Sequence, residues 1–159
     1  MKRTTILPLL ALATLLSATA TAQNTMNDMD TLNLSLEWDK TFPQSERVSH
    51  TKVTFHNRYG ITLAADLYKP KDAVGPLAAV AVCGPYGAVK EQVSGLYAQT
   101  LAERGFLTIA FDPSFYGESG GRPRYLTSPG VSTDDFRAPG AYLSTREAVD
   151  PQRIGLFGI

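Results

Sequence analysis

Two short apolar runs constrain the fold of this 159-residue chain more than any other feature of its sequence. "LAAVAVC" (Leu77 to Cys83) and "FLTIAF" (Phe106 to Phe111) have no regular polar face, which is typical of strands buried on both sides in a parallel sheet. Between them, Lys90 to Arg104 has apolar residues at helical spacing, and Gly105 ends the predicted helix. Its apolar face is expected to comprise Val93, Leu96, Tyr97, Thr100 and Leu101. A strand, a helix and a strand in this order predict a right-handed parallel crossover.

An alternating pattern precedes these runs. Val53 and Phe55 alternate with polar residues, "NRYG" supplies a turn, and Ile61 to Leu67 alternates again before Lys69-Pro70. A period of two around a glycine-containing connection predicts a β-hairpin. Proline ends the second strand because it cannot donate a hydrogen bond to a continuing sheet.

A second helix and a last strand complete the pattern. Ser132, followed by acids, resembles a helix start, and the helix is expected to run to about Val149. Pro139-Gly140 is expected to kink or divide it. Asp150-Pro151 then turns the chain into a buried strand from Arg153 to Ile159. The whole order predicts an α/β fold, a β-hairpin followed by a parallel βαβαβ arrangement.

The amino terminus has the composition of a secretory signal peptide. Lys2 and Arg3 precede an apolar stretch from Ile6 to Leu16 and a run of small residues, with cleavage expected after Ala22. The apolar core of about 11 residues is shorter than the roughly 20 that span a bilayer, so removal is expected rather than anchoring. The sequence therefore predicts a periplasmic or secreted protein with no membrane association after removal of the signal.

The mature chain is expected to have two parts, a polar leader (23–47) and a globular domain (48–159). The leader is predicted to pack loosely, with Trp38 and Phe42 as its apolar anchors. The 15 basic and 15 acidic residues of the chain give no excess of positive charge for nucleic acid or membrane surfaces. Cys83 is the only cysteine, which excludes an internal disulfide and argues against a cysteine metal site.

"GESGG", with Ser119 at its centre, matches the serine-hydrolase pattern G-x-S-x-G. The nucleophile of that pattern sits on a sharp turn between a strand and a helix. Here the strand ends earlier, at Asp112-Pro113, and prolines after Gly121 prevent a prompt helix start. We therefore predict a surface turn in which Asp112 caps the loop. The positive φ angles of that turn are expected at Gly117, Gly120 and Gly121.

The end of the chain has the context that Ser119 lacks. "VDPQRIGLFGI" predicts a turn and a buried strand, and Gly158-Ile159 arrives at the strand tip as the first two residues of a nucleophile elbow. The nucleophile itself is expected at the next position, immediately after Ile159. His50 and His56 precede the first strands of the parallel unit, and we expect them to be surface or strand-face histidines.

Four stretches together resemble one family. "FHNRYGITLAADLYKP", "CGPYGAVKEQ", "FDPSFYGESGGRP" and "VDPQRIGLFGI" are similar to the α/β-hydrolase superfamily, nearest to its dienelactone-hydrolase-like and YcjY-like members. The resemblance covers Val48 to Ile159 and implies the amino-terminal half of that fold, an incomplete three-layer sandwich. It also implies that nucleophile, acid and histidine all follow Ile159, and that the enzyme needs no cofactor or metal.

The resemblance also assigns a role to the loop "CGPYGAVKEQ". In the family this loop supplies one N–H of the oxyanion hole, and the residue after the nucleophile supplies the other. Pro85 has no N–H, so Tyr86 is the preferred donor and Gly87 the second choice. The alternative is a tight strand-to-helix turn without a catalytic role. Lys90 and Glu91 are expected at the helix start.

Two functions remain open from the sequence. The first is an exported enzyme that hydrolyses an ester, a thioester or a related acyl bond of a small molecule. Its nucleophile would be a serine or cysteine after Ile159, so the 159-residue chain itself is expected to be inactive. The second is a non-catalytic truncated product or binding module of the same fold. "GPYGAVK" lacks the spacing of a phosphate-binding loop, which argues against nucleotide binding.

Overall fold

The computed structural model describes residues 32–159. The predicted signal peptide (1–22) and the first part of the leader lie outside these residues. The elements are β1 (Val48–His56), β2 (Thr62–Pro70), β3 (Leu77–Cys83), α2 (Val93–Ala102), β4 (Leu107–Phe111), α3 (Pro129–Ser144) and β5 (Val149–Gly158). Within residues 32–159 no helix has the length and apolar character needed to cross a membrane.

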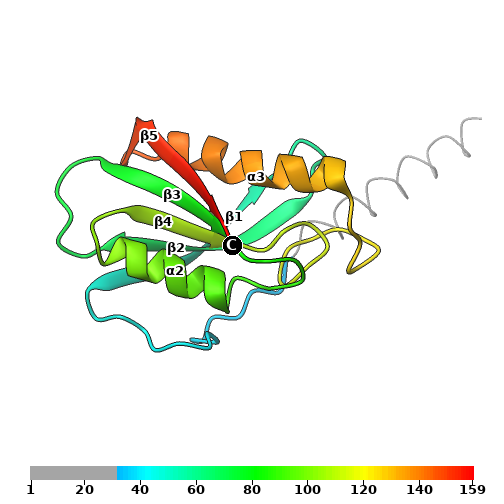
Figure 1. Cartoon of the computed structure of the whole chain (residues 1–159), viewed down its shortest axis with the longest axis horizontal. Helices are drawn as coiled ribbons and strands as arrows, with labels where there is room; N and C mark the ends of the chain where they lie inside the picture. Colours follow the sequence, from blue (N-terminus) through cyan, green and yellow to red (C-terminus); the bar gives the residue numbers. More distant parts are fainter. Residues whose placement is uncertain (1–31) are drawn as a thin grey trace, which may run out of the picture. The chain divides into compact units, whose positions relative to one another are not determined.

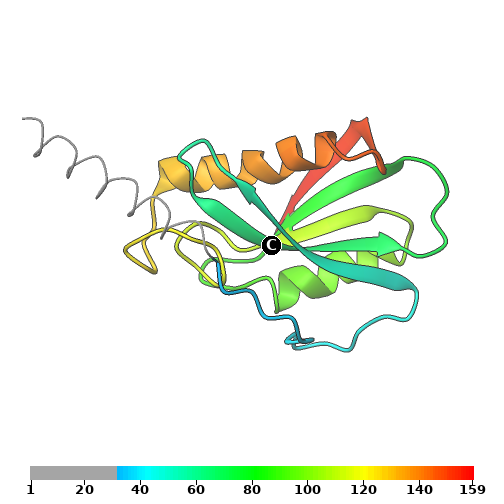
Figure 2. The same cartoon turned by 180° about the vertical axis from the view of Figure 1, so that it is seen from behind.

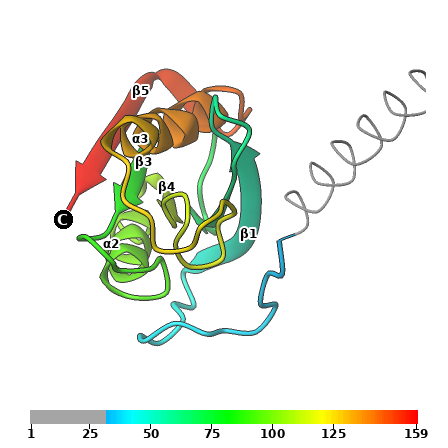
Figure 3. The same ribbon diagram turned by 90° about the vertical axis from the view of Figure 1, so that its right-hand side faces the viewer.

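The strands form one mixed sheet in the order β1-β2-β4-β3-β5. β1 pairs with β2 and β2 with β4 in antiparallel fashion, whereas β3 is parallel to both β4 and β5. Figures 1 and 2 show α2 and α3 on opposite faces of this sheet, and the side view in Figure 3 shows the strands between the two helices. The predicted α/β class, with a hairpin followed by a parallel βαβαβ arrangement, is confirmed.

Both faces of the central strands are buried, as their apolar composition predicts. Leu107, Ile109 and Phe111 of β4 belong to a cluster that also contains Leu143 of α3. Ala110 faces the other way and packs in a second cluster against α2. The alternation along a single strand therefore divides the core into one layer beneath each helix.

The face of α2 was predicted wrongly. Its small and polar residues are buried (Ser94, Gly95, Ala98, Gln99 and Ala102), whereas Leu96 and Tyr97 are almost half exposed. At Gly95 a Cβ would lie 2.3 Å from the Lys90 carbonyl oxygen, so the close approach requires glycine. Helical spacing identifies residues that share one face of the helix, but it does not determine which face packs against the sheet. Here small residues allow the helix to pack closely on it.

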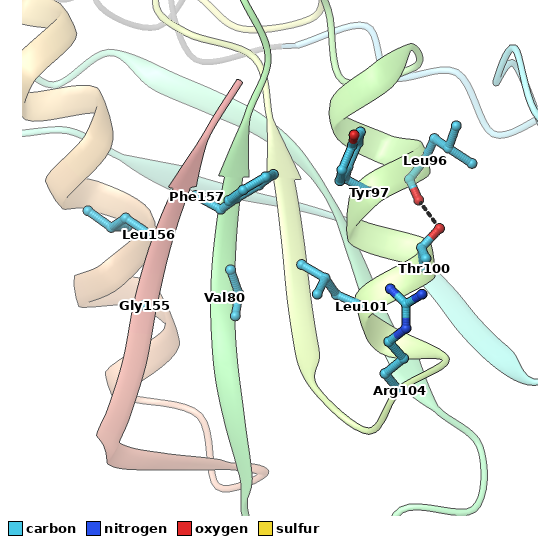
Figure 4. A pocket seen from close by; sticks show the side chains of 9 residues that line it. All are labelled: Val80, Leu96, Tyr97, Thr100, Leu101, Arg104, Gly155, Leu156 and Phe157. Atoms are coloured by element: carbon cyan, nitrogen blue, oxygen red, sulfur yellow. Dashed lines mark hydrogen bonds between the residues drawn. The ribbon is translucent and has the colours of Figure 1, made fainter.

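The large side chains of α2 instead line a groove of about 690 Å³ beside β5 (Figure 4). Its residues are Val80, Leu96, Tyr97, Thr100, Leu101, Arg104, Gly155, Leu156 and Phe157. The rings of Tyr97 and Phe157 face each other across it, 5.5 Å apart at their centroids. β5 is an outer strand of the described sheet, so this apolar surface lies at the sheet edge.

α3 differs from its prediction at both ends and in its continuity. It begins at Pro129, with Ser128 as the N-cap residue, and not at Ser132. Asp135 does not serve the first turn of the helix but accepts hydrogen bonds from Asn57 and Ser114. Of the kink or division expected at Pro139, the division is wrong, because the helix runs through this residue. The helix ends at Ser144 and not at about Val149, which belongs to β5. The Pro139 side chain is fully buried, and this packing compensates for the missing hydrogen bond.

β5 begins at Val149, earlier than predicted. Its pairing with β3 shifts register between Leu77–Val149 and Ala79–Ile154. The predicted turn at Asp150-Pro151 falls inside this irregular part, where the chain gains residues relative to its partner strand. The regular part of the strand, which pairs with β3 from Ile154 to Gly158, lies where the strand was predicted. The predicted burial is wrong for this part, because Leu156 and Phe157 are 56% and 39% exposed at the outer edge of the described sheet.

Residues 32–47 are held more firmly than predicted. Phe42 is buried, and Trp38 packs edge-on against His50 with ring centroids 5.2 Å apart. The Thr41 amide donates to the Glu91 carbonyl at 3.0 Å, and the Ser45 amide donates to Gln99 Oε1 at 3.0 Å. The two aromatic anchors are confirmed, but a loosely packed leader is wrong for this part of it.

Candidate active site

The carboxyl ends of β3, β4 and β5 lie at the same edge of the sheet because the three strands are parallel. In Figure 1 their arrowheads converge near the carboxyl terminus, and the loops after β3 and β4 extend beyond them. Gly158, the predicted elbow glycine, is the last residue of β5 and pairs with Cys83. The Ile159 amide donates to the Cys83 carbonyl at 3.2 Å. Ligands of open α/β sheets bind at this edge.

The loop after β3 starts with a tight turn over Pro85 to Ala88. The Ala88 amide donates to the Pro85 carbonyl at 3.0 Å, and Gly87 has a φ of +79°. These are features of a type II turn with Tyr86 and Gly87 as its central residues. Neither amide of this pair donates to an acceptor within residues 32–159, so both predicted oxyanion donors have a free N–H there.

Asp112, at the end of β4, fixes the far end of the same loop. Its Oδ1 accepts the Lys90 amide at 2.7 Å, and its Oδ2 accepts Lys90 Nζ at 2.8 Å. The Glu118 amide donates to the same Oδ2 at 2.9 Å. A Cβ at Gly117 would lie 2.2 Å from this carboxylate, so the loop closes around it. Asp112 thus joins the loops after β3 and β4, which agrees with its predicted role as a loop cap.

Sequence reasoning missed the buried charges around Asp112. Lys90, expected simply at a helix start, has a fully buried side chain that also contacts Glu118 Oε2 at 2.7 Å. Burial lowers its pKa, but Asp112 and the two nearby glutamates outweigh this, so the pKa of Lys90 is raised and the ammonium is retained. The only signal in the sequence was a lysine directly after the apolar pair Ala88-Val89.

Three carboxylates gather beside this pair, from Asp39, Glu91 and Glu118, with oxygens within 4.8 Å of one another. Lys52 Nζ lies among them, 2.6 Å from Glu118, 3.4 Å from Asp39 and 3.8 Å from Glu91. The ammonium of β1 shares the neutralisation of this cluster with Lys40, which contacts Asp39, and with Lys90, which contacts both glutamates. It also ties the leader to the loop after β4.

Glu91 and Glu118 form a matched pair for a test of this network. Burial raises the pKa of both, but hydrogen bonds from Lys52 and Lys90 bring the pKa of Glu118 below its ordinary value. For Glu91, burial and the charge of Asp112 keep the pKa raised. The ionised form of Glu118 therefore stabilises the fold, and that of Glu91 destabilises it.

We expect Glu118→Gln to lower the free energy of unfolding at pH 7 and Glu91→Gln to leave it unchanged or raise it. Glu118 contributes stability above the ordinary glutamate pKa of 4.5, and this is lost as pH falls through its lowered pKa. The penalty at Glu91 is likewise relieved as pH falls through its raised pKa. Urea unfolding at pH 7 and pH 4 measures both differences, which should shrink at the lower pH. Equal losses for both variants at pH 7 would contradict the assignment.

Ser119 has the environment of a structural residue, as predicted, but the predicted surface position is wrong because its side chain is buried. It is 2% exposed, its hydroxyl donates to the Asp112 carbonyl at 2.7 Å, and it accepts the Ala64 amide at 2.8 Å. Gly117 and Gly121 have positive φ, as predicted, but Gly120 does not. Gly120 instead donates its amide to the Thr62 carbonyl and accepts the Phe115 amide. The hydroxyl thus joins the ends of β2 and β4.

The two histidines lie on β1. His50 Nε2 is 2.8 Å from Asp66 Oδ1, and its ring packs on the α2 side of the sheet against Tyr68. His56 is exposed at the end of the strand. Neither shares a described hydrogen bond with Ser119, which agrees with strand-face and surface positions.

The sequence of this chain is similar to those of several known proteins. The chain is 58% identical over 143 residues to PA2218 of Pseudomonas aeruginosa, covering 89% of this chain and 38% of that protein. It is 46% identical over 114 residues to YcjY of Escherichia coli K12, covering 69% and 37%. Similarity to the thiohydrolase aneE of Aspergillus aculeatus is 32% over 115 residues, covering 72% and 35%. The chain therefore spans well under half the length of these relatives. No protein-family model matches it.

Solved structures agree with these relatives. The crystal structure of PA2218 has a TM-score of 0.78 at 61% identity and covers 79% of this chain and 40% of that one. The α/β hydrolase GrgF of Penicillium sp. sh18 scores 0.63 at 22% identity, with coverages of 70% and 37%. The dienelactone-hydrolase-like P91 from metagenomic libraries scores 0.56 at 15% identity, with coverages of 71% and 49%. The last two, at low identity, support the fold alone.

The strand order and the position of the loops are those of a part of the α/β-hydrolase fold, which the dienelactone-hydrolase-like P91 shares. By its sequence similarity and its fold, the chain belongs among the YcjY-like proteins and forms a part of the α/β-hydrolase fold.

Proposed function

We propose that this domain is the amino-terminal part of an enzyme that hydrolyses an ester or thioester of a small molecule. One observation carries the proposal: the Ile159 amide donates to the Cys83 carbonyl, so the chain leaves β5 beside the start of the loop that contains Tyr86. A nucleophile at the position after Ile159 would lie near the candidate backbone N–H donors of this loop. Among the relatives, aneE is named a thiohydrolase and drtE an acyltransferase, which share the chemistry of acyl transfer.

The proposed reaction follows from this placement. A serine or cysteine after Ile159 attacks the carbonyl carbon, and a histidine later in the chain accepts its proton. The developing oxyanion is stabilised by the Tyr86 N–H, or by that of Gly87, together with the N–H after the nucleophile. The leaving group departs with a proton from the histidine, and water then hydrolyses the acyl-enzyme. The proposed reaction requires neither a metal nor a cofactor.

We further propose that residues 1–22 direct export and that the enzyme acts in the periplasm or outside the cell. The support is the charged, apolar and small-residue pattern that ends at Ala22. Mass spectrometry of the protein from a periplasmic fraction should find a mature amino terminus at Gln23. Recovery only in the cytoplasm with an intact Met1 would overturn this part.

The reading frame after the Ile159 codon provides a direct test of the nucleophile. The proposal expects a serine or cysteine codon next, followed by one residue and a glycine. A stop codon at that point, together with no ester turnover, would favour the alternative, a non-catalytic product of the same fold. The 159-residue chain alone is expected to show no hydrolysis of p-nitrophenyl acetate above the buffer rate.

Ser119 can be excluded as the nucleophile by labelling. In a polypeptide where Ile159 is followed by serine, a fluorophosphonate should label that serine, and Ser119→Ala should leave the labelling unchanged. The same substitution should lower the free energy of unfolding by about 1–3 kcal/mol, because the buried Ala64 amide loses its acceptor. Peptide mapping and urea unfolding measure the two effects. A label on Ser119 would contradict the assignment.

A further inference from the structure

Three tyrosines form an aromatic surface beside the proposed oxyanion turn. Tyr116 is half-buried against the core, and its ring lies edge-on to those of Tyr86 and Tyr125, with centroids 6.2 and 6.0 Å away. Tyr86 and Tyr125 are 80% and 77% exposed. The loops after β3 and β4 thus hold two exposed rings around one anchored ring, a group we call the tyrosine surface.

The hydroxyl groups of this surface also converge. Tyr86 Oη lies 2.6 Å from Thr127 Oγ1, and Tyr116 Oη lies 3.3 Å from the same atom and 3.4 Å from Tyr86 Oη. Hydrogen bonds from Thr127 and Tyr116 lower the pKa of Tyr86. The surface therefore combines ring faces with a cluster of hydroxyl groups that can donate and accept.

The backbone of Tyr125 points to a role beyond folding. Its φ is +61°, in the left-handed region that bulky residues avoid. The loop is held there by the Tyr125 amide, which donates to the Phe115 carbonyl at 3.0 Å, a bond that any non-proline residue could make. The Tyr125 side chain is mostly exposed, so its burial does not offset the strain. Strain of this kind collects at functional sites.

We propose that the tyrosine surface binds an aromatic ring of the substrate, one that carries a hydroxyl or carbonyl oxygen. The inference rests on the proposed acyl-hydrolase function and names its substrate class, an ester or thioester of an aromatic carboxylic acid. Tyr86 contributes both its amide to the oxyanion turn and its ring to the surface. The bound ring therefore lies within a few bonds of the reacting carbonyl. Aromatic rings favour edge-on and offset contacts with tyrosine, and the ring oxygen binds the hydroxyl cluster.

Binding by the 159-residue chain tests this without any turnover. The chain is labelled with ¹³C in its tyrosine rings and titrated with methyl 4-hydroxybenzoate, or with methyl cyclohexanecarboxylate, an ester of similar size with a saturated ring. We expect shifts of the Tyr86, Tyr116 and Tyr125 ring signals and about fivefold weaker binding of the saturated ester. Tyr97, in the groove beside β5, serves as the internal control and should not shift.

Two variants separate recognition from folding. Tyr125→Gly removes the ring where φ is positive, so the melting temperature should stay the same or rise while binding of the aromatic ester falls. Tyr116→Phe keeps the ring and should weaken binding of the 4-hydroxy ester more than that of methyl benzoate. Equal affinity for both ring types, or unchanged binding by Tyr125→Gly, would overturn the proposal. Since no nucleophile takes part, a failure here is distinct from a failure to hydrolyse esters.

Discussion

Asp112→Ala is expected to lower the free energy of unfolding by about 3–5 kcal/mol, the range measured when one partner of a buried ion pair is removed. The substitution removes the acceptor of two backbone amides, those of Lys90 and Glu118, and one contact of a fully buried ammonium. It also leaves a space where the loop closes at Gly117. Urea unfolding of the 159-residue chain and its variant at pH 7 measures the loss.

Two further variants separate charge from shape. Asp112→Asn keeps one oxygen as the acceptor of the Lys90 amide. It removes the negative charge, however, and places an –NH₂ group near Lys90 Nζ, so an intermediate loss of stability is expected. Asp72→Asn, on an exposed turn, makes the same chemical change without a buried partner and should be neutral within about 0.5 kcal/mol. Asp112→Ala with an effect as small as that of Asp72→Asn would show that this carboxylate does not hold the two loops.

The sequence predicts the parallel part of this fold because its strands and helices each have a characteristic local pattern of apolar residues. Strands such as β3 and β4 are apolar on both faces, and their connection through a helix permits essentially one handedness. The pattern also argues against Ser119 as a nucleophile, since a strand must lead directly into the turn of an elbow and a helix must follow it directly. The buried hydroxyl between Ala64 and Asp112 has the structural role that this context predicted.

Other features could not be predicted because they depend on contacts between distant segments. Leu96 and Tyr97 form the more apolar stripe of α2, but Ala98 and Ala102 permit the closer approach to the sheet. Asp135 resembles a first-turn acid, yet its partner is Asn57 in the turn between β1 and β2. The spacing of residues along the chain predicts that such side chains have a structural role, but it does not identify the residues that they contact.

The candidate site was likewise predicted only in part. The sequence pointed to the loop after β3, to Tyr86 and Gly87, and to the tip of the last strand. It did not predict that Lys90 is buried against Asp112, nor that Tyr125 reaches Tyr116 beside the turn. Both contacts join the loops after β3 and β4, and no short-range pattern in the sequence predicts contacts between these two loops.

Tyr86→Pro is expected to lower kcat about 10²–10³-fold in a polypeptide where the proposed nucleophile follows Ile159, with a smaller change in KM. Proline is common at the second position of a type II turn, which Tyr86 occupies, so the turn from Pro85 to Ala88 should persist. The substitution removes the N–H that would stabilise the oxyanion.

Tyr86→Ala provides the matched control, because it removes the same side chain and keeps the amide. Any loss through the tyrosine surface affects both variants alike, so the ratio of their kcat values isolates the N–H. We expect Tyr86→Ala to retain a kcat at least about tenfold above that of Tyr86→Pro, measured with an unhindered acetyl ester that does not depend on the ring. Equal kcat values would exclude Tyr86 as the donor. The remaining candidate would then be Gly87, whose φ of +79° also presents a free N–H at this edge of the sheet.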